Sequence, residues 1–262
     1  MNALTYRSYL DLPTLLSAQH PLSDAHDELL FIAIHQASEI WLKLCLHELE
    51  AARARIAVDD LARASKMMAR VGRVMAQLIG SWEVLATMTP ADYQAMRGRL
   101  GSSSGFQSDQ YRRIEFLLGN RDKAMVGVFR DEPEVQAGLK AELARPSLWD
   151  EAIRLLSRRG FAIDPAILAR DTAAPYVPHD DVAAAWGAVY ADTAAHWDLY
   201  ELAEKLVDLD YRVQLWRFGH LKTVERVIGF KTGTGGTAGV AYLAKVLEAG
   251  FFPELAQMRT RL

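Results

Sequence analysis

Residues 23–58 read SDAHDELLFIAIHQASEIWLKLCLHELEAARARIAV, and this stretch decides the fold. Proline is absent between Pro21 and Pro90, and the first glycine in that interval is Gly72. Because proline and glycine are the residues that most disfavour a helix interior, nothing interrupts a helix from Ser23 onward for well over thirty residues. Ser23 is expected to cap this helix, with acidic side chains in its first turn.

Start signals further along predict more helices. Asp59 and Asp60 mark a restart, so the first helix is expected to belong to a long helical pair. The run TPAD, residues 89–92, combines a capping hydroxyl, a proline for the first helical position and an acid, and Gly101 should end that short helix. Similar patterns predict helical segments over residues 107–118, 133–143, 147–158, 165–170 and 182–218.

No segment shows sustained period-two alternation, so the predicted fold is all-α. The last predicted segment carries an apolar seam, with Leu202 as its first member and Trp216 as its last, at three- and four-residue spacing. Antiparallel packing of long helices with shorter ones would bury such seams. The predicted core consists of Leu30, Ile34, Leu42, Leu46, Leu206, Leu209 and Val213.

Composition excludes several classes of protein. The chain has 262 residues, half of them apolar, and a formal charge of −3 from 30 basic and 33 acidic side chains. Disorder and sequence-independent nucleic-acid binding are disfavoured, because the chain is neither strongly charged nor locally basic. The longest purely apolar run, residues 29–34, is too short to span a bilayer, so we expect a soluble protein without a membrane partner. We expect one folded unit over residues 1–262.

The cysteine count and the N-terminus bear on the compartment. Cys45 is the only cysteine, which excludes disulfide frameworks and cysteine-rich zinc or iron–sulfur sites. The start, MNALTYRSYLDL, lacks the charged and apolar regions of a signal peptide. We expect a cytoplasmic protein in which Cys45 is a buried, unreactive thiol.

A glycine-rich segment, KTGTGGTAG over residues 231–239, has two interpretations. It fits a dinucleotide fingerprint superficially, but an all-α chain offers no βαβ unit around it, and no Gly-Lys-Ser/Thr ends it as in a phosphate-binding loop. Its threonine hydroxyls and backbone amides would suit a mobile lid.

Two of the seven histidines stand out by position. His35 follows the most apolar run and shares a helical face with Phe31, and His220 extends the apolar seam if the helix continues past Gly219. Each could be a satisfied core residue or a ligand. The spacings of a di-iron bundle or a zinc protease motif are absent, so a metal held by protein side chains alone is disfavoured.

Tyr93, Arg97 and Leu100 fall at four- and three-residue spacing and share one face of the short capped helix. Arg97 could be a surface residue with its stem on apolar neighbours. Alternatively, its guanidinium could bind a carboxylate bidentately beside an apolar wall, which would suit an amino acid.

Three long blocks resemble the tryptophan 2,3-dioxygenase family of haem enzymes. They are FIAIHQASEIWLKL (residues 31–44), TPADYQAMRGRLGSSSGFQSDQYRRIEFLLGNR (89–121) and WRFGHLKTVERVIGFKTGTGGTAGVAYL (216–243). They occur in the family's order, and the resemblance extends from LTYRSYL near the start to the glycine-rich segment.

The resemblance implies roles around a haem b cofactor. His220 matches the proximal histidine that binds the haem iron, so it would be both the metal ligand and a cofactor-binding residue. His35 matches the distal, catalytic histidine that faces the indole N–H, with Phe31 on the same wall. Trp82 matches a cofactor-binding residue near the haem.

The substrate L-tryptophan would be held through its polar end. Tyr93 and Arg97 match the pair around the substrate carboxylate, and Thr234 matches a loop threonine that meets the ammonium and carboxylate. Leu100 and Ser104 match other residues of the substrate pocket.

The resemblance further implies a homotetramer, in which the N-terminal segment, residues 1–20, reaches a neighbouring subunit's site through Tyr6, Tyr9 and Leu10. The implied reaction inserts both atoms of O₂ across the indole C2–C3 bond. Its product is N-formyl-L-kynurenine, in the first step of tryptophan degradation by the kynurenine pathway. The chain departs from the family at Thr237, where the loop usually has serine, and the spacing between the N-terminal tyrosines and Phe31 is slightly short.

Two other functions share parts of this pattern. A non-catalytic haem or amino-acid sensor would keep the pocket without the chemistry. A haem oxygenase acting on another indole would keep His220 but would not need Arg97.

Overall fold

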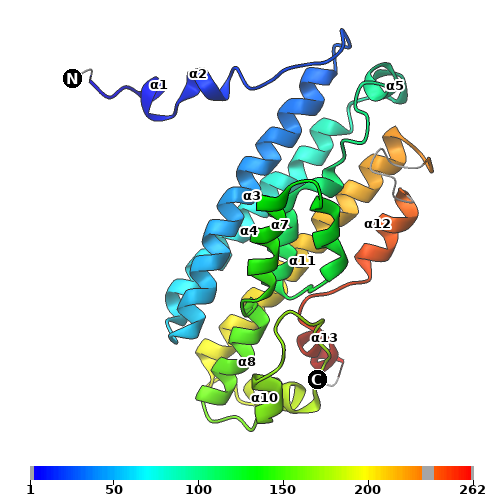
Figure 1. Cartoon of the computed structure of the whole chain (residues 1–262). Coiled ribbons are helices and arrows are strands. Elements are labelled where there is room, and N and C mark those ends of the chain that lie inside the picture. The colour runs from blue at the N-terminus through cyan, green and yellow to red at the C-terminus, as the bar shows by residue number, and fades with distance from the viewer. Residues whose placement is uncertain (1–2, 232–238, 261–262) are drawn as a thin grey trace.

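The computed structural model describes residues 3–231 and 239–260, and it confirms the predicted all-α fold. Within these residues there are thirteen α-helices, two short 3-10 helices and no strand. The longest helices are α3 (Glu28–Ala57), α4 (Leu61–Leu85) and α11 (Trp197–Val227). They lie side by side, and α3 runs antiparallel to both α4 and α11 (Figure 1).

The first long helix begins later than predicted, and Ser23 does not cap it. The Glu28 carboxylate instead accepts hydrogen bonds from the backbone amides of Leu22 and Ser23 and from the Ser23 hydroxyl. These bonds, that of the Leu22 amide above all, hold the pKa of Glu28 below its usual range. The Glu28 side chain thus holds the preceding segment against the start of α3, and that segment is not itself helical. The predicted restart is confirmed, because the Asp60 carboxylate caps α4 by accepting from the Arg63 amide.

The prediction of one helix over residues 182–218 was wrong. The chain forms α10 (Asp180–Ala191) and, after a break, α11. At the break the Asp192 carboxylate accepts a hydrogen bond from the Ala195 amide, which gives the backbone an alternative to the helical bond. At its other end α11 continues through Gly219 to Val227, so His220 does extend the apolar seam.

The shorter helices connect and cover the long ones. In α5 the Thr89 hydroxyl and Asp92 form the predicted capping box, but the helix ends at Arg97, and Gly101 lies in the turn beyond it with a φ of 56°. The remaining elements are α1 (Tyr6–Tyr9), α2 (Leu12–Leu15), η1 (Gly105–Gln107), α6 (Asp109–Leu118), η2 (Lys123–Phe129), α7 (Pro133–Leu143), α8 (Leu148–Arg158), α9 (Pro165–Leu168), α12 (Val240–Leu247) and α13 (Pro253–Arg259).

One large apolar cluster runs through the body from α3 to α13. Of the predicted core residues, four are buried in it: Leu42, Leu206, Leu209 and Val213. Leu30, Ile34 and Leu46 are half-buried and pack against the edges of apolar clusters. Cys45 is fully buried, and burial raises the pKa of its thiol to about 12, so it remains protonated at neutral pH.

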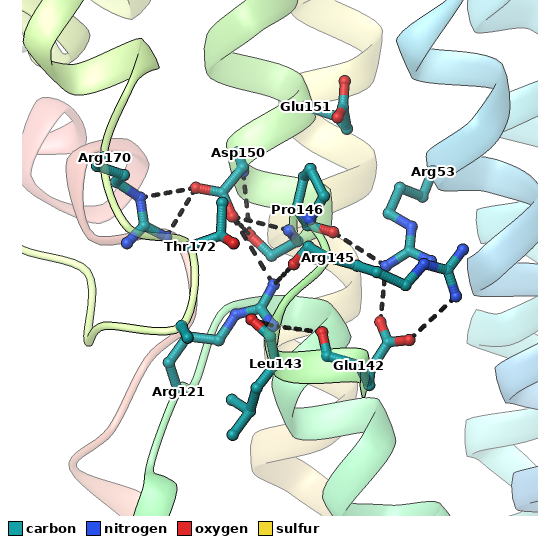
Figure 2. A network of polar contacts seen from close by, with 12 residues as sticks. Arg53, Arg121, Glu142, Leu143, Arg145, Pro146, Asp150, Glu151, Arg170 and Thr172 are labelled. Atoms are coloured by element: carbon teal, nitrogen blue, oxygen red, sulfur yellow. Dashed lines mark hydrogen bonds and ion pairs between the residues drawn. The ribbon is translucent and has the colours of Figure 1, made fainter. Parts of the chain in front are cut away.

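The turn between α7 and α8 is held by buried charges (Figure 2). The fully buried Arg121 donates to the backbone carbonyls of Glu142, Leu143 and Arg145, which satisfies the carboxyl end of α7. Asp150, in the first turn of α8, pairs with Arg170 from the following connector. This junction fixes α7 and α8 against the body, away from the end of the bundle where α5 lies.

The N-terminal segment lies apart from the body. In Figure 1, α1 and α2 extend away from the start of α3. Tyr6 and Tyr9 are 76% and 72% exposed, and Leu10 is exposed as well.

Helix α3 is long and apolar enough, by length and composition, to cross a membrane. A core helix of a soluble protein can meet the same criterion, and α3 packs against α4, α6 and α8. Few residues of its most apolar stretch are fully buried within the single chain. The contiguous apolar run, residues 29–34, is short because Glu28 and His35 bound it.

Candidate functional site

A cavity opens at the end of the bundle where α3 begins and where α4 and α11 end. It contains about 1260 Å³ of empty space, a figure that includes the open space at its mouth. Its walls come from the three long helices, from α5, α6 and α12, and from the loop after α5, and most are apolar or aromatic. The cavity therefore suits a large and mostly apolar occupant.

His220 stands on the α11 wall of this cavity. Its ring stacks on the Trp82 indole, with centroids 4.8 Å apart and an interplanar angle of 12°. The Trp82 Nε1–H donates to the backbone carbonyl of Trp216 over 3.0 Å, which holds the indole against α11. Burial, together with the nearby His35, lowers the pKa of His220 to about 4, so its imidazole is neutral at pH 7. Within the described residues no hydrogen bond to this imidazole is found, so it can offer a lone pair to a ligand.

His35 and Phe31 form part of the α3 wall, on the inward face that their spacing predicted. The Nδ1 atom of His35 lies 2.7 Å from the Phe31 carbonyl oxygen. Because a carbonyl can only accept, Nδ1 carries the proton and Nε2 keeps its lone pair. Burial lowers the pKa of His35 and so favours this neutral form. His35 is therefore prepared to accept a hydrogen bond.

Helix α5 brings Tyr93 to the cavity, with its ring centroid 6.4 Å from that of Phe31. The Arg97 guanidinium carbon lies 5.9 Å from the centre of the Tyr93 ring, so the predicted shared face is present. Leu100 is half-buried and packs in the same apolar cluster as Tyr93 and Phe31. Arg97 and Leu100 adjoin the cavity through Tyr93 and are not part of its wall.

The loop after α5 and the N-terminal segment account for the other predicted site residues. Ser104 lines the cavity, and its hydroxyl caps η1 by accepting from the Phe106 amide. Thr234 lies outside the described residues. Tyr6, Tyr9 and Leu10 are not brought to the cavity of their own chain.

Sequence reasoning missed a polar wall formed by Tyr111, Arg112 and Arg217. Arg217 Nε donates to the Tyr111 hydroxyl over 2.9 Å. Burial, with Glu115 nearby, raises the pKa of Tyr111 above its usual range, so the phenol stays protonated. The available signal was the position of Arg217 three residues before His220, which places it on a neighbouring part of the same helix face.

The fold and the cavity define a class of protein: an all-α ligand-binding protein whose pocket is enclosed by long helices and contains two neutral histidines. The sequence model of the family described as Tryptophan 2,3-dioxygenase matches residues 1–143 and 144–262. The chain therefore belongs to the tryptophan 2,3-dioxygenase family, as the sequence blocks had indicated.

Relatives named Tryptophan 2,3-dioxygenase are similar to this chain over its whole length. One from Erythrobacter litoralis is 62% identical over 99% of this chain and 98% of the relative. One from Bradyrhizobium sp. is 57% identical over 99% of this chain and 93% of the relative. One from Pseudomonas fluorescens is 52% identical over 100% of this chain and 92% of the relative.

Proposed function

We propose that this protein is a haem-dependent dioxygenase that converts L-tryptophan and O₂ to N-formyl-L-kynurenine, the first step of tryptophan degradation by the kynurenine pathway. The observation that carries this proposal is that one cavity joins His35 and His220, each neutral for a physical reason. One imidazole could bind the metal ion of a cofactor, and the other could accept a hydrogen bond. Membership of the family supports the same reaction.

The residues present fit a haem b group, one per subunit. The described residues contain no cluster of three or more metal-ligating side chains, so an iron ion would need an organic carrier and one protein ligand. His220 supplies such a ligand, with Trp82 stacked on it and apolar side chains such as Leu85 and Val227 around it. When bound, haem supplies the redox-active iron at which O₂ is activated.

His35 is proposed to orient the substrate through its free Nε2 atom. The indole N–H is far too weak an acid for a histidine of lowered pKa to deprotonate fully, so Nε2 accepts this proton in a hydrogen bond. Its loss should slow the reaction without abolishing it. Phe31, whose ring centroid lies 4.2 Å from that of His35, provides an apolar wall for the indole.

The carboxylate of L-tryptophan is assigned to Tyr93 and Arg97, its ammonium group to Thr234, and the remaining pocket contacts to Leu100 and Ser104. Support comes from α5, where Tyr93 reaches the cavity and Arg97 lies directly beside it. A bidentate guanidinium would fix the amino-acid end while the aromatic walls hold the indole.

The N-terminal segment is proposed to complete a neighbouring subunit's site in a homotetramer. Tyr6, Tyr9 and Leu10 are exposed in the single chain, as expected for side chains that a second subunit would cover. A cytoplasmic location is proposed as well, because the chain has one cysteine, which is buried and forms no disulfide.

The proposal is tested on the purified protein by recording its Soret band, reducing it, and adding L-tryptophan in air. The absorbance of N-formylkynurenine should grow with time. A protein that takes up no haem contradicts the proposal, and a reduced haem protein that binds tryptophan but stays inert favours a sensor. An indole without the amino-acid group should be a poor substrate, which separates this enzyme from an oxygenase for other indoles.

Arg97→Ala tests the substrate contact. We expect the KM for L-tryptophan to rise on the order of a hundredfold or more, because removing one partner of a buried charge pair costs about 3–5 kcal/mol. The haem spectrum should stay normal. An unchanged KM would contradict the assignment of Arg97.

A further inference from the structure

The polar wall of the cavity contains two arginines that share one carboxylate. Arg112 on α6 and Arg217 on α11 are 5% and 4% exposed, and Glu115 between them is 2% exposed. Arg217 Nη2 donates to Glu115 Oε1 over 2.8 Å, and Arg112 Nη1 donates to Glu115 Oε2. Both carboxylate oxygens are therefore in use, and the group carries an excess of one positive charge.

No other acid of the described residues neutralises this excess by a direct ion pair. Asp210 lies about two helical turns before Arg217 on α11. Its carboxylate accepts a hydrogen bond from the Gln214 amide group and lies outside ion-pair distance of both guanidinium groups. A buried charge without a partner is costly, by several kcal/mol per ion after relaxation. The fold therefore maintains a cation at the cavity that no direct ion pair of the described residues balances.

Arg112 also keeps an unused donor. Its Nη2 donates to the Phe106 carbonyl, but its buried Nε has no hydrogen-bond partner among the described residues. The guanidinium carbon lies 4.7 Å from the centre of the Phe106 ring and 5.2 Å from that of Tyr111. Two aromatic rings and a carboxylate thus hold the guanidinium in one place on the cavity wall.

The surroundings connect Arg112 to the His220 side of the cavity. The Tyr111 ring centroid lies 4.9 Å from that of Trp216, which in turn lies 6.2 Å from that of His220. Arg97 lies elsewhere, beside the Tyr93 ring that contacts Phe31. Arg112 and Arg97 therefore adjoin different parts of the cavity. A carboxylate bound at Arg112 would belong to an occupant that reaches His220.

From this arrangement we infer that Arg112, supported by Arg217 through Glu115, binds a carboxylate of the cofactor. An iron porphyrin with carboxylate side chains is an occupant that would satisfy both the His220 imidazole and the cation that no ion pair balances. This inference rests on the proposed haem dependence. It assigns Arg112 as a cofactor-binding residue and Arg217 as the residue that positions it.

The test measures haem retention in the absence of catalysis. Wild type, Arg112→Gln and Arg113→Gln are loaded with ferric haem, and the rate of haem transfer to an excess of a haem-free acceptor protein is followed by the Soret band. Arg113 is the matched control, because it is next on the same helix, pairs with Asp109 and is not part of the cavity wall. In Arg112→Gln the Glu115 carboxylate keeps Arg217 as its partner, so the buried acid is not orphaned.

We expect Arg112→Gln to release haem about tenfold faster or more, which corresponds to about 1.4 kcal/mol or more. Arg113→Gln should match wild type. Repeating the measurement with the dimethyl ester of haem, which lacks free carboxylates, should bring wild type close to the variant. This ester arm needs no variant, so it tests whether the protein holds the haem carboxylates even if Arg112→Gln folds poorly, and an ester released as slowly as haem would overturn the inference.

Three other results would overturn the inference, and they differ in what else they affect. Equal release from wild type and Arg112→Gln, with haem retained by both, removes the Arg112 assignment and leaves the proposed function standing. If Arg112→Gln releases haem at the wild-type rate but binds L-tryptophan with a raised dissociation constant, Arg112 binds the carboxylate of the substrate and not one of the cofactor. A wild type that takes up no haem removes the proposed function together with the inference.

Discussion

Gly219 shows how one missing side chain positions the candidate iron ligand. A Cβ atom at this position would lie 2.6 Å from Trp82 Cδ1, well inside van der Waals contact. Only glycine lets the indole approach α11 closely enough to stack on His220 and donate to the Trp216 carbonyl. The glycine in WRFGH therefore serves packing next to the site, in spite of its cost inside a helix.

Gly219→Ala is predicted to displace the Trp82 ring. Overpacking of this kind costs about 1–3 kcal/mol, and the loss of the stacked neighbour should change the Soret band of the haem-loaded protein. Gly80→Ala is the control, because a Cβ there meets nothing within 4 Å and alanine favours a helix by about 0.5–1 kcal/mol. If Gly219→Ala unfolds in urea at or above the wild-type midpoint, as Gly80→Ala should, the close contact at Gly219 is not important.

Glu254 on α13 predicts a pH dependence of stability. It is fully buried, and burial raises its pKa above the usual 4.5. Because the unfolded chain releases this proton first, stability falls as pH rises from 4.5 through the folded pKa and then levels off. One carboxyl oxygen accepts from Tyr176 and from the His179 amide, and Oε2 has no partner among the described residues. Glu254→Gln should therefore raise the free energy of unfolding by about 1 kcal/mol at pH 7, with the gain vanishing at pH 4.

Glu28→Gln is the matched comparison with the opposite sign. The pKa of Glu28 is lowered by bonds from the Leu22 amide and its neighbours, so its contribution is present above pH 4.5 and is lost as pH falls through the folded pKa. Urea unfolding over a series of pH values should thus show Glu28→Gln most destabilised at pH 7 and progressively less so as the pH falls below 4.5. A pH-independent effect of either variant would contradict the assigned pKa directions.

The sequence predicted the site residues whose role follows from helical spacing. It could not predict those whose role depends on contacts between distant segments. His35 and His220 were selected because they continue apolar faces that the sequence displays. Arg112 and Arg217 share Glu115 only after α6 and α11 pack together. The family resemblance supplied the roles of Tyr93 and Arg97, which spacing alone left open between surface and ligand.

At the scale of elements, α5 is held by its cap and carries Tyr93 and Arg97. Thr89→Ala removes a capping box, which typically costs about 1 kcal/mol. The helix should fray, and we expect the KM for L-tryptophan to rise severalfold as these two side chains lose their positions. Ser147→Ala removes the capping box of α8, which contributes no cavity residue, so it should lower stability and leave KM unchanged. Equal KM values for the two variants would show that the α5 cap is not needed for binding.

The bounds of a helix were predicted well where the sequence signals that define them are local. The predicted bounds for α7 and α8 are close to those observed, because prolines and serine caps define them within a few residues. The start of α3 and the break before α11 were missed, since Glu28 and Asp192 act there through side-chain bonds to the backbone. Such bonds compete with the helix and leave no periodic signature.

At the scale of the whole molecule, the N-terminal segment tests the proposed assembly. Tyr6 and Tyr9 are largely exposed, so Tyr6→Ala/Tyr9→Ala should change single-chain stability by no more than about 0.5 kcal/mol. If these rings complete a neighbouring site, kcat/KM should fall about tenfold or more. Leu4→Ala, at an equally exposed position, is the control. Steady-state kinetics measures kcat/KM of each variant, and sedimentation analysis measures its oligomeric state. A stable monomer with full activity would contradict the proposed assembly.

The placement of the two histidines on the first and last long helices has a consequence for biosynthesis. His35 leaves the ribosome well before α11 and the α12 wall do. A nascent fragment that lacks α11 cannot enclose the cavity, so a cofactor bound as proposed would be captured only after α11 has been synthesised. Contacts between such distant segments also slow folding. If the protein binds haem as proposed, chains that end before α11 would bind none.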